Sequence, residues 1–477
     1  MTTTRWKHAV GGFFNAPSAW TNGVPTGGDT ALLTVSGPTY TVSSQQDNSV
    51  GKLEMASNAI LSIALDDFSV TSGTGTGALG GTIVVGDGAD LTLGTFGTST
   101  TFDITGAIDI KAGADATHLN IDGPLTLIGA GRINLSGDNA YLFGYSGTSS
   151  IDKLTNACTI TGSGIVGDDP NFAFVNTAKG IIAANSAGNN LVIYIPDGFS
   201  NSGLMEATHS GILYFQTGIT QTAKGEVKAA TSGSRVELNG ITITGGVIAT
   251  VNGSVLAGVG GSSEINTTTA VANAGTIGAE GGNLTITGSV KNASTGALVA
   301  KANSSLIIDG SVTGGKATID DTSFIEFGGP SSAKVIFSAG STGGLVLGDA
   351  TKFTGTVAGM SADPGAGIDL ENIPFAHITA ADVTYSATLH LLTVVDPTDH
   401  VTDKIKISGP AGTFTASAGF FGTTVIKDPP VAHANTDLLV QSMASFGASS
   451  GIAGSGIGSL AENHTSSDFL TPNSHLG

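Results

Sequence analysis

Apolar and threonine residues alternate in short runs along most of this chain, and glycine, asparagine, aspartate or serine stands between the runs. The clearest runs lie at residues 82–85, 91–93, 125–128, 192–195, 241–244, 284–287 and 306–309. An alternation with a period of two is typical of β-strands that bury one face. Glycine and asparagine suit the corners, where a positive φ or a side-chain hydrogen bond to the backbone is needed. Helical periodicity is nearly absent, so the pattern predicts an all-β fold.

The runs recur as an internal repeat between residues 80 and 350. Residues 201–215 and 273–287 follow nearly the same order of residue types, and further copies begin at residues 223 and 295. A spacing of about 18 to 24 residues between copies indicates a solenoid, whereas a β-sandwich has shorter hairpin spacings. We therefore predict a parallel β-helix (β-solenoid), right-handed because crossover connections favour that hand. The repeat region would form about 13 coils and a rod roughly 60 to 65 Å long.

Changes in composition divide the chain into four segments. Residues 1–50 predict an N-terminal capping segment, residues 51–350 the solenoid body, and residues 351–430, with longer alternating runs, the terminal coils and a C-terminal β cap. Residues 431–477 are rich in glycine and serine, lack basic residues and predict a flexible tail with one short amphipathic helix and a candidate C-terminal secretion signal.

Three residues of rare type have a structural and a functional interpretation. Trp6 and Trp20 lie in the capping segment, where bulky rings would cover the first coil; the alternative is a sugar-binding site. Cys158 is the single cysteine, so no disulfide framework or cysteine metal cluster exists. We expect it to pack as a small apolar residue.

The composition bears on partners and location. The 477 residues contain 71 glycines, and 37 acidic residues against 18 basic ones give a formal charge of -19. A surface of this sign repels phosphate backbones and anionic lipid headgroups, so nucleic acid is not an expected partner. No apolar run approaches the ~18 residues that cross a bilayer. The N-terminus shows no Sec-type signal, which leaves the cytoplasm or another export route.

Parts of the chain resemble a class of secreted bacterial proteins. Residues 20–33 and 40–42, together with the glycine- and asparagine-cornered repeat, resemble the β-helical passenger regions of bacterial autotransporters and related adhesins. Residues 353–359 and 438–447 resemble the end of large alphaproteobacterial secreted β-repeat proteins. The resemblance implies a β-helix at the cell surface or outside the cell, and the tail then suggests type I-like secretion.

No cluster of residues in the sequence has the spacing of a catalytic or metal site. The run Gly86–Asp90 matches a calcium-binding repeat pattern once, but such sites need the pattern in tandem, so calcium is only a weak candidate and no other cofactor is expected. The nine histidines show no ligand spacing. Neighbouring acids on a strand point to opposite faces, so each pair supplies at most one carboxylate to a common site. The pairs considered are Asp320 and Asp321 with Glu326, Asp66 and Asp67, and Asp168 and Asp169 with Lys153. We expect them to be solvated corners, and we assign no catalytic, cofactor-binding or metal residue.

The sequence therefore predicts a non-enzymatic structural or adhesive β-solenoid, outside the cell or on its surface. Its partners would be other copies in a layer or filament, or a matrix or surface glycan. The alternative is a carbohydrate-active β-helix enzyme: a polysaccharide lyase, glycosidase or epimerase. Such an enzyme would present a groove lined by carboxylates, basic residues and aromatic rings, whereas a scaffold would present smooth faces of serine, threonine and asparagine.

Overall fold

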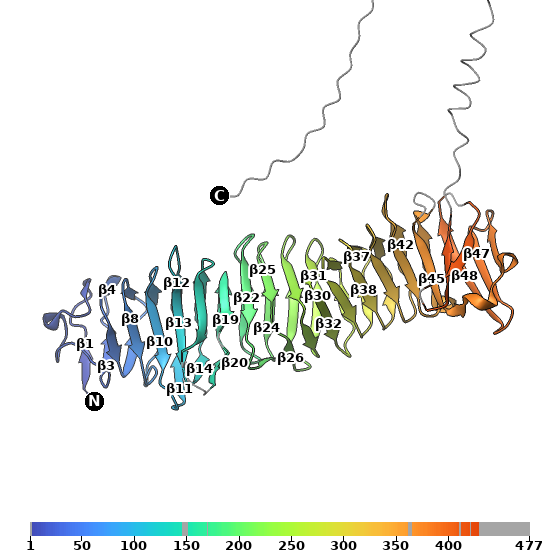
Figure 1. Cartoon of the computed structure of the whole chain (residues 1–477). Coiled ribbons are helices and arrows are strands. Elements are labelled where there is room, and N and C mark those ends of the chain that lie inside the picture. Colours follow the sequence, from blue (N-terminus) through green and yellow to red (C-terminus); the bar gives the residue numbers. More distant parts are fainter. Residues whose placement is uncertain are drawn as a thin grey trace, which may run out of the picture. The chain divides into compact units, whose positions relative to one another are not determined.

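The computed structural model describes residues 2–145, 151–168, 170–360, 365–409, 412–419 and 421–428. These residues form a parallel β-solenoid of about 15 turns, which confirms the predicted all-β solenoid fold (Figure 1). Helices within the described ranges are short 3-10 turns: η1 (Pro17–Ala19), η2 (Ala350–Lys352), η4 (Phe375–His377) and η5 (Ala380–Asp382). At about 4.8 Å per turn the stack is roughly 70 Å long. The predicted flexible tail, residues 431–477, lies outside the described residues.

Each turn of the body gives one strand to each of three parallel sheets. Sheet I contains β5 (Asn48–Val50), β8 (Asp67–Val70), β10 (Asp90–Gly94), β13 (Thr117–Asp122), β16 (Ala140–Gly144), β19 (Gly164–Gly167), β22 (Asn190–Tyr194), β25 (Ile212–Phe215), β28 (Arg235–Asn239), β31 (Val255–Gly260), β34 (Thr276–Glu280), β37 (Ala297–Lys301), β40 (Lys316–Ile319), β42 (Lys334–Phe337) and β44 (Thr356–Ala358). Sheet II contains β11 (Thr100–Asp103), β14 (Pro124–Ile128), β17 (Asp152–Asn156), β20 (Phe172–Asn176), β23 (Phe199–Asn201), β26 (Ile219–Gln221), β29 (Thr242–Thr244), β32 (Ser262–Asn266), β35 (Asn283–Ile286), β38 (Ser305–Ile308), β41 (Phe324–Phe327), β43 (Gly344–Leu347) and β45 (Gly367–Pro374). Sheet III contains β2 (Gly12–Phe13), β4 (Tyr40–Ser44), β7 (Ala59–Ile63), β9 (Thr82–Val85), β12 (Ala107–Lys111), β15 (Arg132–Ser136), β18 (Thr159–Gly162), β21 (Ile181–Ala184), β24 (Leu204–Ala207), β27 (Glu226–Ala229), β30 (Val247–Thr250), β33 (Val271–Asn273), β36 (Val290–Asn292) and β39 (Val312–Thr313).

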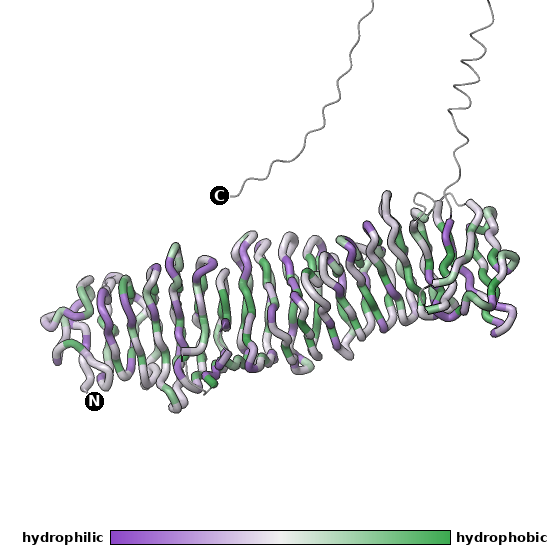
Figure 2. The backbone as a smooth tube through the Cα atoms, viewed as in Figure 1, coloured by the Kyte–Doolittle hydropathy of each residue, from purple (hydrophilic) through white to green (hydrophobic). Residues whose placement is uncertain are grey.

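Apolar side chains stack inside the solenoid from one turn to the next. Leu91, Leu119 and Leu142 are register neighbours on β10, β13 and β16, and all three are fully buried. The intervening residues of the same strands point outward, as the period of two requires. Polar and apolar residues consequently alternate along the coils in Figure 2. The stacked aliphatic columns are the hydrophobic core, and each turn packs only against its neighbours.

A ladder of buried amide side chains runs along one inner edge of sheet II. Asn156, Asn176, Asn201 and Gln221 end the successive strands β17, β20, β23 and β26, and all four side chains are buried. The side-chain NH₂ groups of the three asparagines each donate to the side-chain amide oxygen of the next turn, at 3.0, 2.9 and 2.8 Å. Because every amide in the row has partners, the ladder places polar groups inside the solenoid without leaving unpaired donors. Asparagine therefore turns inward here, whereas the sequence pattern indicates only a corner residue.

The first turn is covered by aromatic side chains. Trp6 and Trp20 are buried and meet edge to face at 5.1 Å, and Phe14 lies 5.2 Å from Trp20. Each indole N–H donates to a backbone carbonyl, Trp6 to Val10 and Trp20 to Phe14. Parallel pairing of β1 (Thr3–Arg5), β3 (Thr30–Leu33) and β6 (Lys52–Met55) begins at this end. Both rings fill the core, so their faces are not exposed to a sugar.

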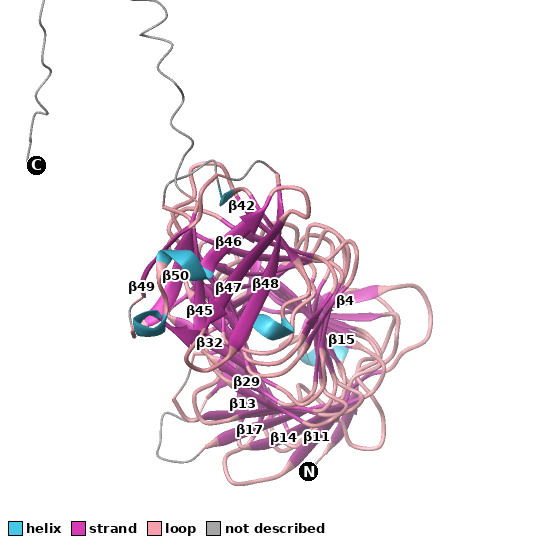
Figure 3. Ribbon diagram, turned by 90° about the vertical axis from the view of Figure 1, so that its right-hand side faces the viewer, coloured by secondary structure: helices cyan, strands magenta, loops and turns pink. Residues whose placement is uncertain are grey.

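The last turn is extended by two groups of antiparallel strands. Sheet I continues from β44 into β48 (Val401–Ser408), β47 (Leu391–Asp396) and β46 (Val383–Ser386). Sheet II continues from β45 into β50 (Thr423–Lys427) and β49 (Thr415–Ala418). Figure 3 views the molecule from this end. The change from parallel to antiparallel pairing ends the coil and forms the predicted C-terminal β cap.

A buried carboxyl group in the cap makes stability depend on pH. Asp403 on β48 is fully buried, and Asn372 Nδ2 lies 3.2 and 3.1 Å from its two oxygens. Burial raises the pKa of Asp403 to about 6. Because the folded protein then binds this proton more tightly than the unfolded chain, the group stabilises the fold at acidic pH, and that contribution is lost as the pH rises from about 4 to about 6.

We expect Asp403→Asn to raise the free energy of unfolding at pH 7 by up to about 2 kcal/mol, because a neutral amide is no longer penalised by burial. Urea unfolding at a series of pH values would measure this. The variant should also lack the contribution of Asp403, which falls between pH ~4 and ~6. Asp115→Asn, at an exposed aspartate, is the matched control and should follow the wild type. Identical pH profiles for wild type and Asp403→Asn would contradict the assignment.

Candidate binding face on sheet I

Charged and aromatic side chains gather on the outer side of sheet I. Among the described residues, every ion pair between solenoid strands lies on this side. The outer side of sheet II carries serine and threonine at several positions, for example Thr155, Ser200, Thr220 and Thr285, and its charged residues, such as Lys153 and Glu326, form no ion pair in the described residues. Sheet I therefore combines ion pairs between turns with aromatic rings on one face.

One column of outward side chains follows sheet I from turn to turn. Its members, which we call the sheet I column, are register neighbours on consecutive strands: Asp67, Asp90, His118, Tyr141, Ile165, Val192, Tyr214 and Glu237. The column spans about 34 Å at the usual strand spacing. Acidic residues and a histidine stand at one end, apolar and aromatic residues in the middle, and a glutamate at the other end.

A histidine cluster forms the first part of the column. His118 Nδ1 lies 2.6 Å from Asp90 Oδ1, and the His118 ring lies 5.3 Å from Tyr141 and 5.1 Å from Phe143. Asp67 stands on the far side of Asp90, and its pKa is raised, first by burial and then by the negative charge of Asp90. The cluster combines an orientated imidazole with two half-buried aromatic rings.

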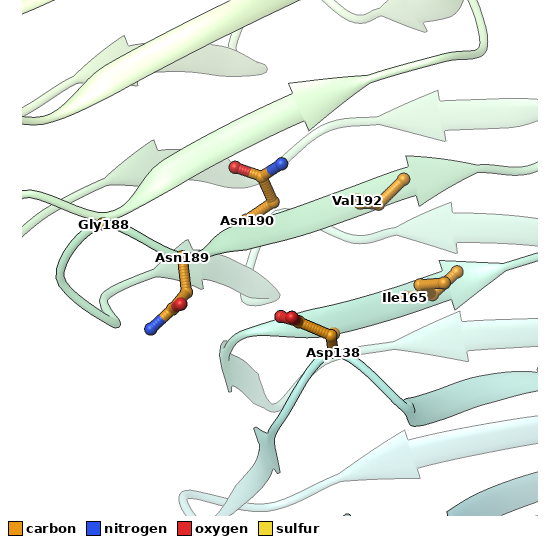
Figure 4. Close-up of a pocket in the computed structure, with 7 residues that line it drawn as sticks. Asp138, Ile165, Gly188, Asn189, Asn190 and Val192 are labelled. Carbon is orange, nitrogen blue, oxygen red and sulfur yellow. The ribbon is translucent and has the colours of Figure 1, made fainter. Parts of the chain in front are cut away.

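A hollow of about 320 Å³ opens beside the middle of the column. Ile165 and Val192 supply its apolar side, and Asp138, Asn189 and Asn190 supply carboxylate and amide groups. Figure 4 shows Ile165 and Val192 on the adjacent strands β19 and β22, with Asp138 in the turn before β16 and Asn189 in the turn before β22. An apolar wall with a few polar groups at its edge is the usual composition of a site for a small polar molecule.

An arginine cluster forms the other end of the column. Arg235 Nε lies 2.7 Å from Glu237 Oε1, and its NH2 group lies 2.9 Å from Glu280 Oε2, two turns further along. Lys301 Nζ lies 3.2 Å from Glu280 Oε1. The register places Ala257 beside Glu237 on the intervening strand, where a small side chain leaves room for the guanidinium to reach across. The four charged groups hold one another in place on a face that is half-buried.

Two of the carboxylates considered from the sequence, Asp321 and Glu326, lie away from sheet I. Asp321 stands in an exposed turn and accepts from the backbone N–H of Ala302, at 3.2 Å. Glu326 stands on the outer side of β41, in register with Ile307 and Val346, and burial raises its pKa. Neither side chain contributes to the face on sheet I. Asp67 does, through its neighbour Asp90.

The remaining residues considered from the sequence lie on different parts of the solenoid. Lys153 is on sheet II, whereas Asp168 follows the sheet I strand β19; Asp169 lies outside the described residues. In the run that resembles a calcium repeat, the Asp87 carboxylate accepts from the backbone amides of residues 113 to 115, and Asp90 contacts His118. Cys158 is buried, which raises its pKa to about 12.

The sequence reasoning missed His118, Tyr214, Arg235 and Glu280. A signal existed in the spacing, because residues that stack on one face are separated by whole repeats: 28 residues from Asp90 to His118 and 45 from Arg235 to Glu280. The variable corner length of the repeat hid this relation. These residues can be placed on one face only when the register of each strand pair is known.

The chain matches no family model, no curated protein and no solved structure. In the part of the chain that the structure describes, no helix has the length and hydrophobicity that crossing a membrane requires.

Proposed function

We propose that this protein is a non-enzymatic structural or adhesive β-solenoid of the bacterial cell surface or extracellular space, and that it binds a glycan along the sheet I column. A stack of about 15 turns provides long lateral faces, which suits a structural element. Type I-like export through residues 431–477, and association of copies into a layer or filament, belong to the same proposal.

The sheet I column is the observation that carries the glycan assignment. Tyr141 and Tyr214 offer ring surfaces, and Ile165 with Val192 offers an apolar wall between them. Sugar rings have apolar faces and hydroxyl edges, so they suit such surfaces flanked by amide and carboxylate groups. The repeat of one outward side chain per turn favours an extended polymer. The formal charge of -19 favours a neutral or amino-sugar polymer over a polyanion.

The arginine cluster keeps a carbohydrate-active enzyme as a second candidate. Glu237 and Glu280 lie on the same face and contact one guanidinium, and paired carboxylates are the groups that glycoside cleavage uses. Both carboxylates are bonded to Arg235, however, which supports a binding role because a catalytic acid or base needs a free proton site. Assays for new reducing ends and for unsaturated products separate the two candidates.

We expect Tyr141→Ala to weaken binding to its preferred neutral polysaccharide about 5- to 10-fold, since one stacking surface is lost. Affinity electrophoresis of the full chain in gels that contain neutral, amino-sugar or uronic-acid polysaccharides would measure the retardation. Thr285→Ala, on the outer side of sheet II, is the control and should migrate as the wild type does.

Three outcomes would refute the proposal. If Tyr141→Ala and Thr285→Ala changed the migration equally, or if no polysaccharide slowed the wild type, the sheet I column would not be a glycan site. If the wild type depolymerised its ligand, and Glu280→Gln abolished that activity, the protein would be an enzyme.

A further inference from the structure

Three potential metal ligands meet in the C-terminal cap, away from the sheet I column. His377 comes from η4, Asp396 ends β47, and Asp399 follows in the turn before β48. His377 Nδ1 lies 2.9 Å from Asp396 Oδ2 and 3.3 Å from Asp399 Oδ2, and one ligand atom from each residue lies within 4.8 Å of the other two. The chain brings together residues that are separated by up to 22 positions, which is why the sequence showed no ligand spacing.

The buried member of the cluster is fixed in position. Asp396 is fully buried, and its Oδ1 accepts from the backbone N–H groups of Thr398 and Asp399, at 2.8 and 3.1 Å. Its other oxygen, Oδ2, is thereby aimed at His377. Backbone donors that orientate a carboxylate are typical of the surroundings of metal ligands.

His377 Nδ1 is hydrogen-bonded to Asp396 Oδ2, and the exposed Asp399 carboxylate approaches the same nitrogen. A single imidazole nitrogen carries at most one hydrogen, yet two carboxylate oxygens from different residues converge on Nδ1 of His377. A cation at the centre would satisfy all three atoms. Zinc binds imidazole nitrogen and carboxylate oxygen at about 2.0 to 2.2 Å, and tetrahedral ligands at that distance lie about 3.3 Å apart. The separations of 2.9 and 3.3 Å already approach this arrangement.

We propose that His377, Asp396 and Asp399 bind one divalent cation of the zinc class, with solvent at the fourth position. One imidazole and two carboxylates favour zinc over calcium, which takes six to eight oxygen ligands. The ion joins the segment between β45 and β46 to the turn between β47 and β48, so it clips the antiparallel cap together. This site is independent of the proposed glycan binding.

The proposal can be tested by isothermal titration calorimetry. The full chain is first stripped of metal with a chelator and is then titrated with zinc chloride. We expect one zinc ion per chain, and at a free zinc concentration 100 times the Kd we expect the ratio of folded to unfolded protein to rise about 100-fold. Asp399→Asn should weaken zinc binding at least about 10-fold, because it removes one anionic ligand. The Asp399 side chain is more than half exposed, so this variant should fold even where His377→Gln does not.

His209→Gln, at an exposed histidine outside the cluster, is the control and should bind zinc as the wild type does. X-ray absorption at the zinc edge should report one nitrogen and oxygen ligands at ~2.0 to 2.1 Å, which a purely structural histidine would not produce. The proposal fails if the wild type takes up no zinc, if Asp399→Asn binds zinc unchanged, or if calcium binds at these residues and zinc does not.

Discussion

A Gly162→Ala variant is expected to lose at least about 3 kcal/mol of folding stability, enough to disrupt the turns around it. Gly162 ends β18 with a φ of +115°, and a Cβ atom there would stand 1.8 Å from the backbone oxygen of Leu135 on the adjacent strand. Backbone atoms of a paired strand cannot move away without breaking the ladder. Circular dichroism during urea unfolding would measure the loss.

Gly198→Ala separates the two causes of that loss. Gly198 has a nearly identical φ of +117°, but no atom lies within 4 Å of the position that a Cβ would take. This variant therefore carries the backbone strain without the collision, and we expect it to lose about 1 to 2 kcal/mol. Equal losses in the two variants would show that close packing of neighbouring turns is not the main requirement at Gly162.

Changes in the amide ladder are expected to have the second large effect. Asn176→Ala should lower the free energy of unfolding by about 2 to 4 kcal/mol, because it leaves the amides of Asn156 and Asn201 without a partner on one side. Asn176→Asp has the same shape but places a second acceptor against Asn201 Oδ1 and the Gly180 carbonyl. We expect it to lose about 3 to 5 kcal/mol, as a buried unpaired carboxylate does.

Asn134→Ala is the matched control for the ladder. Asn134 points outward from β15 and is only half-buried, so its loss should change stability by less than about 0.5 kcal/mol. Urea unfolding, with hydrogen exchange of the amides in β17 to β26, would localise the effect. If Asn134→Ala and Asn176→Ala lost equal stability, the ladder would not be a source of stability.

The sequence sufficed for the architecture because the solenoid depends on local rules. Alternation within a run fixes which residues face inward, and the recurrence of runs such as 201–215 and 273–287 implies stacking. The sequence did not allow us to predict that Asn201, the first residue of such a run, belongs to the amide ladder. A corner asparagine and a ladder asparagine look alike in the sequence, and only the inward rotation of the side chain, bonded to Asn176 and Gln221, distinguishes them.

The candidate sites depend on relations between turns, which the sequence leaves open. His118 and Tyr141 are neighbours on the outer side of sheet I because β13 and β16 pair in one register. A slip of the register by one residue would turn one of the two side chains into the core. Corner lengths vary from turn to turn, so the register cannot be counted along the chain. The cluster at His377 could not be predicted from the repeat at all, because the antiparallel cap brings its residues together.

The amide ladder has two closed ends, and this limits how the rod can change length. Asn156 Oδ1 accepts from the backbone N–H of Cys158 at the first rung, and Gln221 Nε2 donates to the backbone carbonyl of Gly245 at the last. If one entire turn between these ends were removed, the amide of the next turn would take the vacant place. If only part of a turn were removed, one amide in the interior would lose its hydrogen-bond partner. We therefore expect duplications and deletions between β17 and β26 to be tolerated as whole turns, so that the length of this part changes in steps of about 4.8 Å.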